Sequence, residues 1–395
     1  MKKKEILIFI RGKDTRFNAV NNLIDFLFDC DYKIKICLIG SKKEVDESCR
    51  ILKLKYGNVD ICNLIIYEGS LITKIRFALE LIYYNLKPKK KDKNKNYVKT
   101  KILFVGQSAF LYYLIINSEY SFYLNNEDIR FWAIELPLKY RKASFLKRIM
   151  FEKGENYLLN NSRRQLFSNQ ERVDFMKNKN ITNEDAFYFV FHNYPLIRDI
   201  KKFNLQLSNN INSEKKYICL SGVLDKYRCP ENFLKAVCEL YKKTKIKLLL
   251  AGWPTNKTRK MIEKYNRKNK CIDFIGSISK EKLFDIQINA LFGCAFYFGN
   301  SVNNALCAPQ KIYEYLLLDI PILTSDNISL KFVNDRSLGM SIRENDNYYM
   351  IYSKLIELTN KREFYKKNIH LWKKNNLSYN FVLKELKGAV DFILE

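Results

Sequence analysis

The stretch NNALCAPQKIYEYLLLDIPILTSD, from Asn303 to Asp326, decides the fold. It predicts a polar loop that closes on Pro309, a short helix, and then the buried strand IPIL. Lys311 and Glu314 lie in the first turn of this helix, where four backbone N–H groups lack partners and favour anions and polar ligands. The helix is therefore either a platform for a ligand or only a well-capped helix.

Apolar runs alternate with helical patterns on both sides of this stretch. In the N-terminal half we expect strands at 5–10, 33–40, 62–67 and 101–106, and helices at 18–30 and 73–86. In the C-terminal half we expect strands at 216–222, 245–253, 271–276, 291–299 and 320–325, and helices at 230–243 and 280–290. Such alternation predicts βαβ units and parallel sheets.

The length of 395 residues predicts two domains, and the polar segment Asp199–Lys216 is the expected linker. The expected domains are 1–198, completed by a C-terminal helix at 378–395, and 199–377. Two doubly wound α/β domains that face one another place a cleft at the carboxyl ends of both sheets, where such folds bind ligands.

Composition narrows the class of protein. No apolar run approaches the roughly 18–20 residues that span a bilayer, and the apolar run after MKKKE is too short for a signal peptide. The ten cysteines form no CxxC pair and there are two histidines, which argues against a zinc site and favours reduced thiols in the cytosol.

The net charge of +27 has two explanations. One is the codon bias of an AT-rich genome, because the chain is rich in Lys, Asn, Ile, Tyr and Phe. The other is attraction to an anionic membrane surface or substrate. No nucleic-acid-binding motif accompanies the charge, so we expect no nucleic-acid partner.

Four loop positions follow predicted strands on the ligand-binding edge: Gly222, Gly276, Gly299 and Pro309. In SGVLDKYRCPENF, the cations Lys226 and Arg228 suit a pyrophosphate, although a basic turn explains them equally. In FIGSISKEKL, a flat base could lie against the backbone at Gly276, although a helix cap at Ser279 also explains these residues.

Glu314 carries the most information. A carboxylate at the right depth accepts hydrogen bonds from both hydroxyls of a ribose, and the loop amides from Asn303 to Ala308 could hold a diphosphate in front of the helix. The alternative is an ion pair between Lys311 and Glu314, worth a few tenths of a kcal/mol.

The segment PQKIYEYLLLDIP resembles the donor-site helix of GT-B glycosyltransferases, especially family 4 (glycosyl transferases group 1) enzymes of bacterial surface-polysaccharide synthesis. In that family a Glu, followed seven residues later by Pro, binds the ribose of a nucleotide sugar, and Glu314 and Pro321 keep this spacing. The resemblance extends over Lys216–Ser325 and more loosely over the whole chain. It implies a GT-B fold and a donor site formed by Gly222, Gly276, Ile278, Asn303, Asn304, Pro309, Lys311 and Glu314.

Three departures from the family pattern stand out. A second family Glu, eight residues before the ribose Glu, is replaced by Leu306. The usual Gly five residues after the ribose Glu is Asp319, and the glycine-rich first loop is reduced to RGKDTRFN. Leu306 and Asp319 favour the alternative of a degenerate, non-catalytic subunit.

The resemblance also implies that the N-terminal domain binds the acceptor. Arg11, Asp14, Gln107 and Glu135 would then face the cleft, with Glu135 as a catalytic candidate. FHNYP resembles the last strand and turn of the domain, so His192 either borders the cleft or is a hydrogen-bonded histidine at a strand end.

Two basic segments have alternative interpretations. The run 87–101 is either a solvated loop or a lipid-facing patch. The segment 138–154 mixes basic residues, among them Lys139, Arg141, Lys142, Lys147 and Arg148, with apolar ones. This is the pattern of a helix that rests on an anionic membrane, or else of one that packs its apolar side into the domain.

Together these features predict a cytoplasmic glycosyltransferase, or one peripheral on the inner face of the plasma membrane. It would be of hexosyltransferase type, retaining, and would take a UDP- or GDP-sugar and a glycan or lipid-linked acceptor for lipopolysaccharide or capsule synthesis. Lys226 and Arg228 would stabilise the departing diphosphate, so no metal or other cofactor is required. The alternatives are a nucleotide-sugar epimerase and a degenerate, non-catalytic GT-B subunit.

Overall fold

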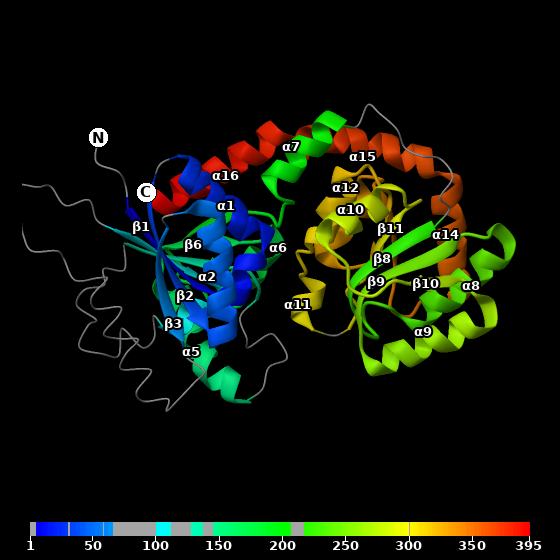
Figure 1. Cartoon of the computed structure of the whole chain (residues 1–395), viewed down its shortest axis with the longest axis horizontal. Helices are drawn as coiled ribbons and strands as arrows, with labels where there is room; N and C mark the ends of the chain where they lie inside the picture. The colour runs from blue at the N-terminus through cyan, green and yellow to red at the C-terminus, as the bar shows by residue number, and fades with distance from the viewer. Residues whose placement is uncertain are drawn as a thin grey trace, which may run out of the picture. The chain divides into compact units, whose positions relative to one another are not determined.

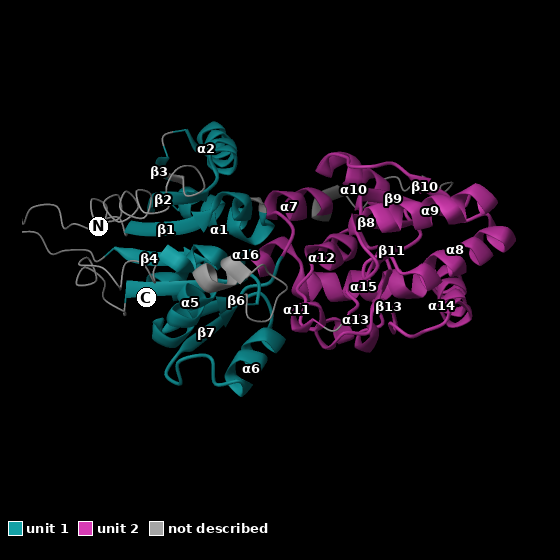
Figure 2. Ribbon diagram, turned by 90° about the horizontal axis from the view of Figure 1, so that it is seen from below, with its two compact units in different colours: residues 1–193, 383–395 teal, residues 194–382 magenta. Residues whose placement is uncertain are grey.

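A computed structural model describes residues 5–30, 32–57, 59–65, 100–111, 128–136, 145–206, 217–299 and 301–395. The chain divides into two compact units, shown in teal and magenta in Figure 2. Unit 1 contains residues 1–193 and 383–395, and unit 2 contains residues 194–382. The boundary predicted from the sequence lies between residues 198 and 199.

Unit 1 is built on a parallel sheet in the order β3-β2-β1-β4-β5-β6-β7 (Figure 1). Its strands are β1 (Glu5–Arg11), β2 (Lys33–Gly40), β3 (Asp60–Ile65), β4 (Lys101–Val105), β5 (Ile129–Ala133), β6 (Arg164–Phe167) and β7 (Phe187–Val190). Its helices are α1 (Asn18–Asp29), α2 (Lys42–Tyr56), α5 (Phe145–Asn161) and α6 (Gln170–Asn178), with 3-10 turns η1 (Gly12–Arg16) and η2 (Gly106–Ser108).

The central strand β1 contains a continuous apolar run because both faces of the sheet are covered there. Ile6, Ile8 and Ile10 alternate with Leu7 and Phe9, and all five side chains are buried. The order of the strands reverses between β1 and β4, so the carboxyl ends of these two strands form the switch point where parallel sheets bind ligands.

Unit 2 repeats the same order in its sheet, β10-β9-β8-β11-β12-β13, with all pairs parallel. Its strands are β8 (Tyr217–Leu224), β9 (Lys247–Pro254), β10 (Ile272–Phe274), β11 (Gly293–Ala295), β12 (Ile322–Ser325) and β13 (Gly339–Ile342). Its helices are α7 (Ile197–Gln206), α8 (Glu231–Thr244), α9 (Asn256–Asn269), α10 (Lys280–Ile288), α11 (Val302–Ala305), α12 (Gln310–Leu317), α13 (Lys331–Asp335), α14 (Tyr348–Asn360) and α15 (Arg362–Asn376), with a 3-10 turn η6 (Ile328–Leu330).

The two faces of this sheet carry different helices. Leu220 and Leu250 point toward α8, α9 and α14 in one apolar core. On the opposite face lies α12, whose Tyr315 hydroxyl donates to the Cys219 carbonyl at 3.4 Å. Figure 1 shows α9 and α12 on opposite sides of β8 and β9.

The last helix, α16 (Tyr379–Leu394), ends within unit 1. There Val390 and Ile393 are buried, and the buried guanidinium of Arg130 on β5 donates from Nε to the Ile393 carbonyl at 2.8 Å. No helix in the described ranges is long and apolar enough to cross a bilayer.

Four sequence expectations need correction. The first half of the expected linker is the helix α7, because Ile200 and Phe203 recur at helical spacing and are buried. The expected loop at Asn303 and Asn304 is the short helix α11, capped by the Ser301 hydroxyl, which accepts from the Asn304 amide at 3.2 Å.

The other two corrections concern strands. β11 is shorter than expected because the Tyr297 amide leaves the ladder and donates to the Ser325 hydroxyl at 3.0 Å. Gly222 lies inside β8, not after it, because β8 and β9 stay paired through Gly222 and Gly252.

The expected helix at 73–86 and the run 87–99 lie outside the described residues. So does the first part of the basic segment, 138–144, whereas the rest of it begins α5.

Candidate functional site

The helix that carries Glu314 begins as predicted, directly after Pro309, which is its N-cap residue. Glu314 is buried at 5% exposure. Its Oε1 accepts a hydrogen bond from Gln310 Nε2, one turn earlier, at 2.5 Å. A buried carboxylate near a helix N-terminus is the kind of group that binds hydroxyls or is held by the protein itself.

Lys311 does not pair with Glu314. Its ammonium donates to the Ser221 carbonyl on β8, so among the described residues the ion pair with Glu314, the alternative interpretation, is absent. The pKa of Lys311 is lowered to about 8, chiefly by burial; Glu314 opposes this shift and Arg228 contributes to it. Lys311 therefore lies close enough to Arg228 and Glu314 for both charges to affect its pKa, although its ammonium binds the strand and not the carboxylate.

Gly222 explains how the lysine reaches the strand. A Cβ at this position would lie 2.2 Å from Lys311 Nζ, and the backbone φ of +104° favours glycine. The absence of a side chain lets the ammonium pack directly on β8. Gly222 is therefore a packing partner of Lys311 in this structure.

The loop after β8 holds Arg228 in a defined position. Asp225 Oδ1 accepts from the amides of Tyr227 and Arg228, both at 2.9 Å. Asp225 Oδ2 accepts from Arg228 Nη1 at 2.7 Å, and the guanidinium lies 5.5 Å from the centre of the Tyr297 ring. Arg has five N–H donors in a fixed fork, so one carboxylate contact leaves it capable of binding an anion.

Lys226 is placed differently. It is exposed, and its ammonium lies 4.7 Å from the centre of the neighbouring Tyr227 ring. The structure brings Arg228, Lys311 and Glu314 together and leaves Lys226 at the surface.

The segment between β11 and α12 is held by side-chain amides. Asn304 donates to the Phe298 carbonyl at 2.5 Å, and Asn327 donates to the carbonyls of Tyr297 and Asn304 at 2.9 and 2.7 Å. Asn303 Oδ1 is buried with no hydrogen-bond partner in the part of the chain that the structure describes. A buried polar atom of this kind is uncommon and is satisfied by a bound group or water.

Gly276 and Ile278 lie where the sequence places them, after β10. The Ser279 hydroxyl accepts from the Lys282 amide at 3.3 Å and caps α10, as expected. A Cβ at Gly276 would meet no atom within 4 Å, so the space above its backbone is open.

Asp319 departs from the family glycine but keeps its conformation. Its φ is +55°, and the bonds from Ile320 N to Tyr315 O and from Asp319 N to Leu316 O form a Schellman end to α12. Its Oδ2 pairs with the buried ammonium of Lys373 at 2.6 Å, which also donates to the Leu317 carbonyl at 3.2 Å. Burial lowers the pKa of Lys373, and Asp319 opposes this. Sequence reasoning missed Lys373, which has no local signal.

Leu306, the other departure, is buried at 7% exposure at the end of α11. It supplies no carboxylate to this loop.

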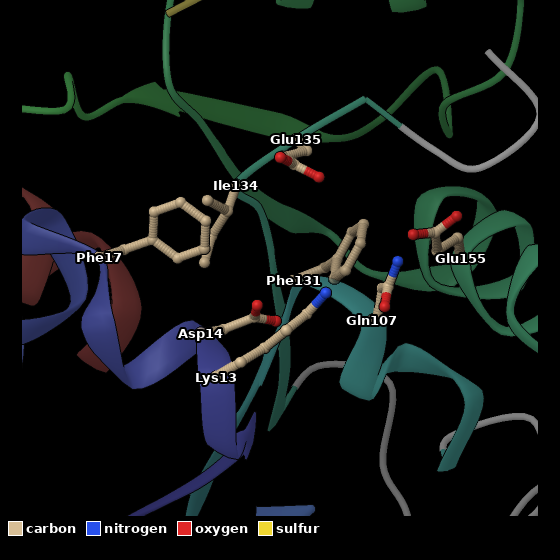
Figure 3. A pocket seen from close by; sticks show the side chains of 9 residues that line it. Lys13, Asp14, Phe17, Gln107, Phe131, Ile134, Glu135 and Glu155 are labelled. Atoms are coloured by element: carbon tan, nitrogen blue, oxygen red, sulfur yellow. The ribbon is translucent and has the colours of Figure 1, made fainter. Parts of the chain in front are cut away.

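A pocket of about 140 Å³ lies at the switch point of unit 1 (Figure 3). Asp14 and Glu155 are buried in it, whereas Lys13 and Glu135 are exposed at its rim. The other lining residues are Phe17, Gly106, Gln107, Phe131 and Ile134. Figure 3 shows the three carboxylates around one space, with the Phe131 ring between them.

Two contacts shape this pocket. Arg11 Nη1 donates to Gln107 Oε1 at 2.7 Å and Nη2 donates to Glu44 at 3.3 Å, so the Gln107 amide is oriented by Arg11. A Cβ at Gly154 would lie 2.4 Å from the Ala109 carbonyl oxygen, and this close approach of α5 brings Glu155 into the pocket. The sequence singled out Arg11, Asp14, Gln107 and Glu135, but not Glu155, whose contribution depends on the packing of α5.

His192 follows β7 in unit 1. Burial lowers the pKa of its imidazole to about 4, and a hydrogen bond with the Ser168 backbone opposes this. The imidazole is therefore neutral at physiological pH and hydrogen-bonded, which fits the alternative of a strand-end histidine.

Proteins of known structure share this architecture. WaaG, a glycosyltransferase involved in lipopolysaccharide biosynthesis, matches with a TM-score of 0.59 at 10% identity, covering 96% of this chain and 98% of WaaG. Anabaena Alr3699/HepE, solved with UDP, matches at 0.66 with 10% identity and coverages of 98% and 99%. UDP-GlcNAc 2-epimerase from Neisseria meningitidis, solved with UDP-GlcNAc, matches at 0.63 with 12% identity and 99% of each chain covered. No protein-family model and no curated protein sequence matches the chain.

The chain has the GT-B fold. The two parallel sheets, one in each unit, and the likeness to these solved structures confirm the predicted fold class. At identities of 10 to 12% the likeness shows the fold and not the activity.

Proposed function

We propose that the protein is a glycosyltransferase that moves a sugar from a nucleotide-sugar donor to a glycan or lipid-linked acceptor. The observation that carries this proposal is the cluster of Arg228, Lys311 and Glu314 at the carboxyl edge of the unit 2 sheet. Such a cluster offers an acceptor for ribose hydroxyls beside cations for a diphosphate. The similar structures solved with UDP and with UDP-GlcNAc support a UDP-linked donor, with GDP as the other candidate.

In this proposal Glu314 accepts hydrogen bonds from the two ribose hydroxyls. Arg228 and the N-terminal end of α12 hold the diphosphate, and Lys226 closes over it from the surface. The orphaned Oδ1 of Asn303 is an acceptor and can bind a hydroxyl of the donor. As the bond between the sugar C1 and the diphosphate oxygen breaks, its electron pair passes to the diphosphate, where these cations stabilise the charge. Because side chains supply this stabilisation, the proposal requires no metal.

The acceptor would bind in the unit 1 pocket. A pocket of about 140 Å³ suits a single sugar ring, and its aromatic walls and three carboxylate acceptors suit the faces and hydroxyls of such a ring. The acceptor oxygen forms the new bond to C1, and its proton passes to Glu135 or to the departing diphosphate. We assign Glu135 the catalytic position because it lies at the rim of the pocket, where an acceptor hydroxyl can emerge.

We further propose a retaining hexosyltransferase of lipopolysaccharide or capsule synthesis on the cytoplasmic face of a membrane. The support is the family resemblance of the donor helix, the net charge of +27 and the basic segment that leads into α5.

A nucleotide-sugar 2-epimerase is the second candidate, favoured by the likeness to the Neisseria enzyme. A non-catalytic subunit is the third, favoured by Leu306. Nuclear magnetic resonance of a UDP-sugar incubated with the protein separates the three. A transferase releases free sugar slowly to water, an epimerase converts the bound sugar, and a non-catalytic subunit leaves the donor unchanged.

The test of the donor site is Glu314→Gln, which keeps the shape of the side chain but removes its charge. If Glu314 holds both ribose hydroxyls, UDP binding should weaken about 10- to 150-fold, the equivalent of roughly 1.5–3 kcal/mol. A 2′,3′-dideoxy nucleotide should lose little, since it has no hydroxyls to bind. Titration calorimetry measures both ligands.

The matched control is Glu363→Gln on α15, whose side chain is 76% exposed and which should not change binding. Equal losses for the ribo- and dideoxy-nucleotides would contradict the assignment of Glu314.

A further inference from the structure

Three neighbouring strands of unit 2 expose apolar side chains at their carboxyl ends. Trp253 on β9 is 64% exposed, Val223 on β8 is 49% exposed, and Ile275 directly after β10 is 39% exposed. Val223 and Trp253 are register partners, and the Ile275 amide donates to the Leu250 carbonyl on β9 at 3.0 Å. A contiguous apolar patch of this kind, unlike a lone exposed side chain, indicates a binding surface.

The patch lies on the same face of the sheet as the proposed donor site. Side chains alternate along a strand, and Leu220 and Leu224 point into the core beneath α8. Val223 therefore points to the opposite face, as does its neighbour Trp253. This is the face on which α12 carries Lys311 and Glu314.

Glycines without side chains, Gly222 and Gly252, form the backbone between Lys311 and Trp253. Gly222 and Gly252 are register partners, and the Gly252 amide donates to the Gly276 carbonyl at 2.7 Å. The Lys311 ammonium packs on Gly222, and the space above Gly276 is open. Since neighbouring strands lie about 4.8 Å apart, Trp253 stands about one strand spacing from the point where Lys311 reaches the sheet.

We infer that Trp253 stacks on the base of the nucleotide and is a specificity-determining residue of the donor site. This inference rests on the proposed binding of a nucleotide sugar. A ribose held by Glu314 directs the attached base over the backbone of Gly222 and Gly252, toward β9 and β10. There the indole offers an aromatic face, while Val223 and Ile275 shield the ring from water. An aromatic side chain next to bare backbone suits a flat ring better than it suits a branched lipid chain.

The experiment compares Trp253→Ala and Trp253→Phe by titration with UDP, GDP, CDP and ADP. Stacking on an aromatic side chain predicts that Trp253→Ala weakens the nucleotide that the protein prefers by about 5- to 150-fold. Trp253→Phe should keep most of the affinity. Ribose 5-phosphate, which has the sugar and a phosphate but no base, should bind all three proteins equally.

Tyr349→Ala is the matched control. Tyr349 is 65% exposed, close to the exposure of Trp253, and lies on α14 after β13, at the opposite edge of the sheet from β10. It should leave every affinity unchanged. Fluorescence adds a direct readout, because the chain has three tryptophans and Trp132 is buried. The preferred nucleotide should quench the wild-type emission, and the quenching should be lost in Trp253→Phe.

Several results would overturn the inference. Unchanged nucleotide affinity in Trp253→Ala would remove Trp253 from the donor site while leaving the proposed function intact. The same result together with lost binding to anionic lipid vesicles, or with a changed oligomeric state, would assign the patch to a lipid or to a second copy of the chain. Absence of binding of any of the four nucleotides to the wild-type protein would overturn both the inference and the proposed function.

Discussion

The two units share one strand order but differ in the charge they place at the switch point. In unit 1 the pocket beside β1, β4 and β5 has three carboxylates and one lysine: Asp14, Glu135, Glu155 and Lys13. In unit 2 the ends of β8 and β11 are surrounded by three cations and two carboxylates: Lys226, Arg228, Lys311, Asp225 and Glu314.

In the proposed function, the fold supplies only the sheet edge where ligands bind, and the side chains at that edge decide which ligand binds. Parallel sheets of this order place several loops at one switch point, whatever the loops contain. Cations there favour a diphosphate, whereas acceptors beside aromatic rings favour the hydroxyls of a sugar. One scaffold, used twice, thereby divides donor and acceptor between two units in the proposed reaction.

The largest expected effect is a loss of stability in unit 2. It should come from Lys373→Met, which removes the ion pair at the C-terminal end of α12. The Lys373–Asp319 pair is buried, with side-chain exposures of 5% and 11%. Removal of one partner leaves the other charge buried, and we expect a loss of about 3–5 kcal/mol in the free energy of unfolding. Urea unfolding followed by fluorescence measures this loss, because Trp372 lies in the same helix.

The control is Lys374→Met, one residue further along α15, where the side chain is exposed and the effect should be small. The double variant Lys373→Met with Asp319→Asn should recover much of the stability, because Asn tolerates a positive φ and leaves no buried charge. Similar losses for Lys373→Met and Lys374→Met would show that the pair does not hold the helix.

The second prediction concerns how stability and UDP affinity depend on pH. It tests the contrast in charge between the two units. The pKa of Lys311 falls from 10.5 to about 8 on folding, so between these values the unfolded chain binds more protons. Stability should therefore rise by about 2 kcal/mol from pH 8 to pH 9.5, as the cost of burying the charged lysine disappears. UDP affinity should fall over the same range, because a cation beside the proposed diphosphate site is lost.

Calorimetric titrations and urea unfolding between pH 7 and pH 9.5 measure these opposite trends. Lys311→Met carries no charge and should show neither trend. UDP affinity that stays flat in the wild-type protein would mean that the charge of Lys311 does not reach the ligand.

The smallest effect should be that of Glu155→Gln in unit 1. The substitution keeps the shape of the pocket but replaces a charged acceptor by a neutral one, which weakens a hydrogen bond to a sugar hydroxyl by about 1 kcal/mol. The KM for the acceptor should rise about fivefold, while the Kd for UDP should not change. Steady-state kinetics measures the first and calorimetry the second.

Glu184→Gln, an exposed carboxylate elsewhere in unit 1, is the control and should alter neither constant. A weaker UDP affinity in Glu155→Gln would remove the distinction between the two units on which the proposed division of ligands rests.

Local patterns predicted the strands that are continuous apolar runs, such as β1 and β2, and the helices with clear amphipathic spacing, such as α1 and α8. They did not predict β13 or α9. β13 is the short segment GMSI, and α9 is a largely polar helix that buries Thr258 and Ile262 and is capped by Thr255. Short or polar segments carry a weak local signal, and their structure follows from the neighbours they pair with.

The candidate site divides in the same way. The spacing of Pro309, Lys311 and Glu314 is local, and the helix begins where the sequence predicts. The partner of Lys311 is 90 residues away on β8, and the partner of Asp319 is 54 residues away on α15. A pairing across such distances in the chain has no periodic signature. The sequence offered an ion pair with Glu314 as one of two alternatives, and the described residues do not form it.

The sequence by itself determined the fold class, because buried parallel strands must be apolar on both faces and the helices between them must carry an apolar stripe. It also determined which loops contain charge. Only the tertiary structure decided which charges meet. The strand order brought β8 beside β11, Gly222 admitted the Lys311 ammonium, and the close packing at Gly154 carried Glu155 into the pocket. These contacts depend on distances between segments that are remote in the chain, and a side chain's chemistry reveals what it can bind only after its neighbours are known.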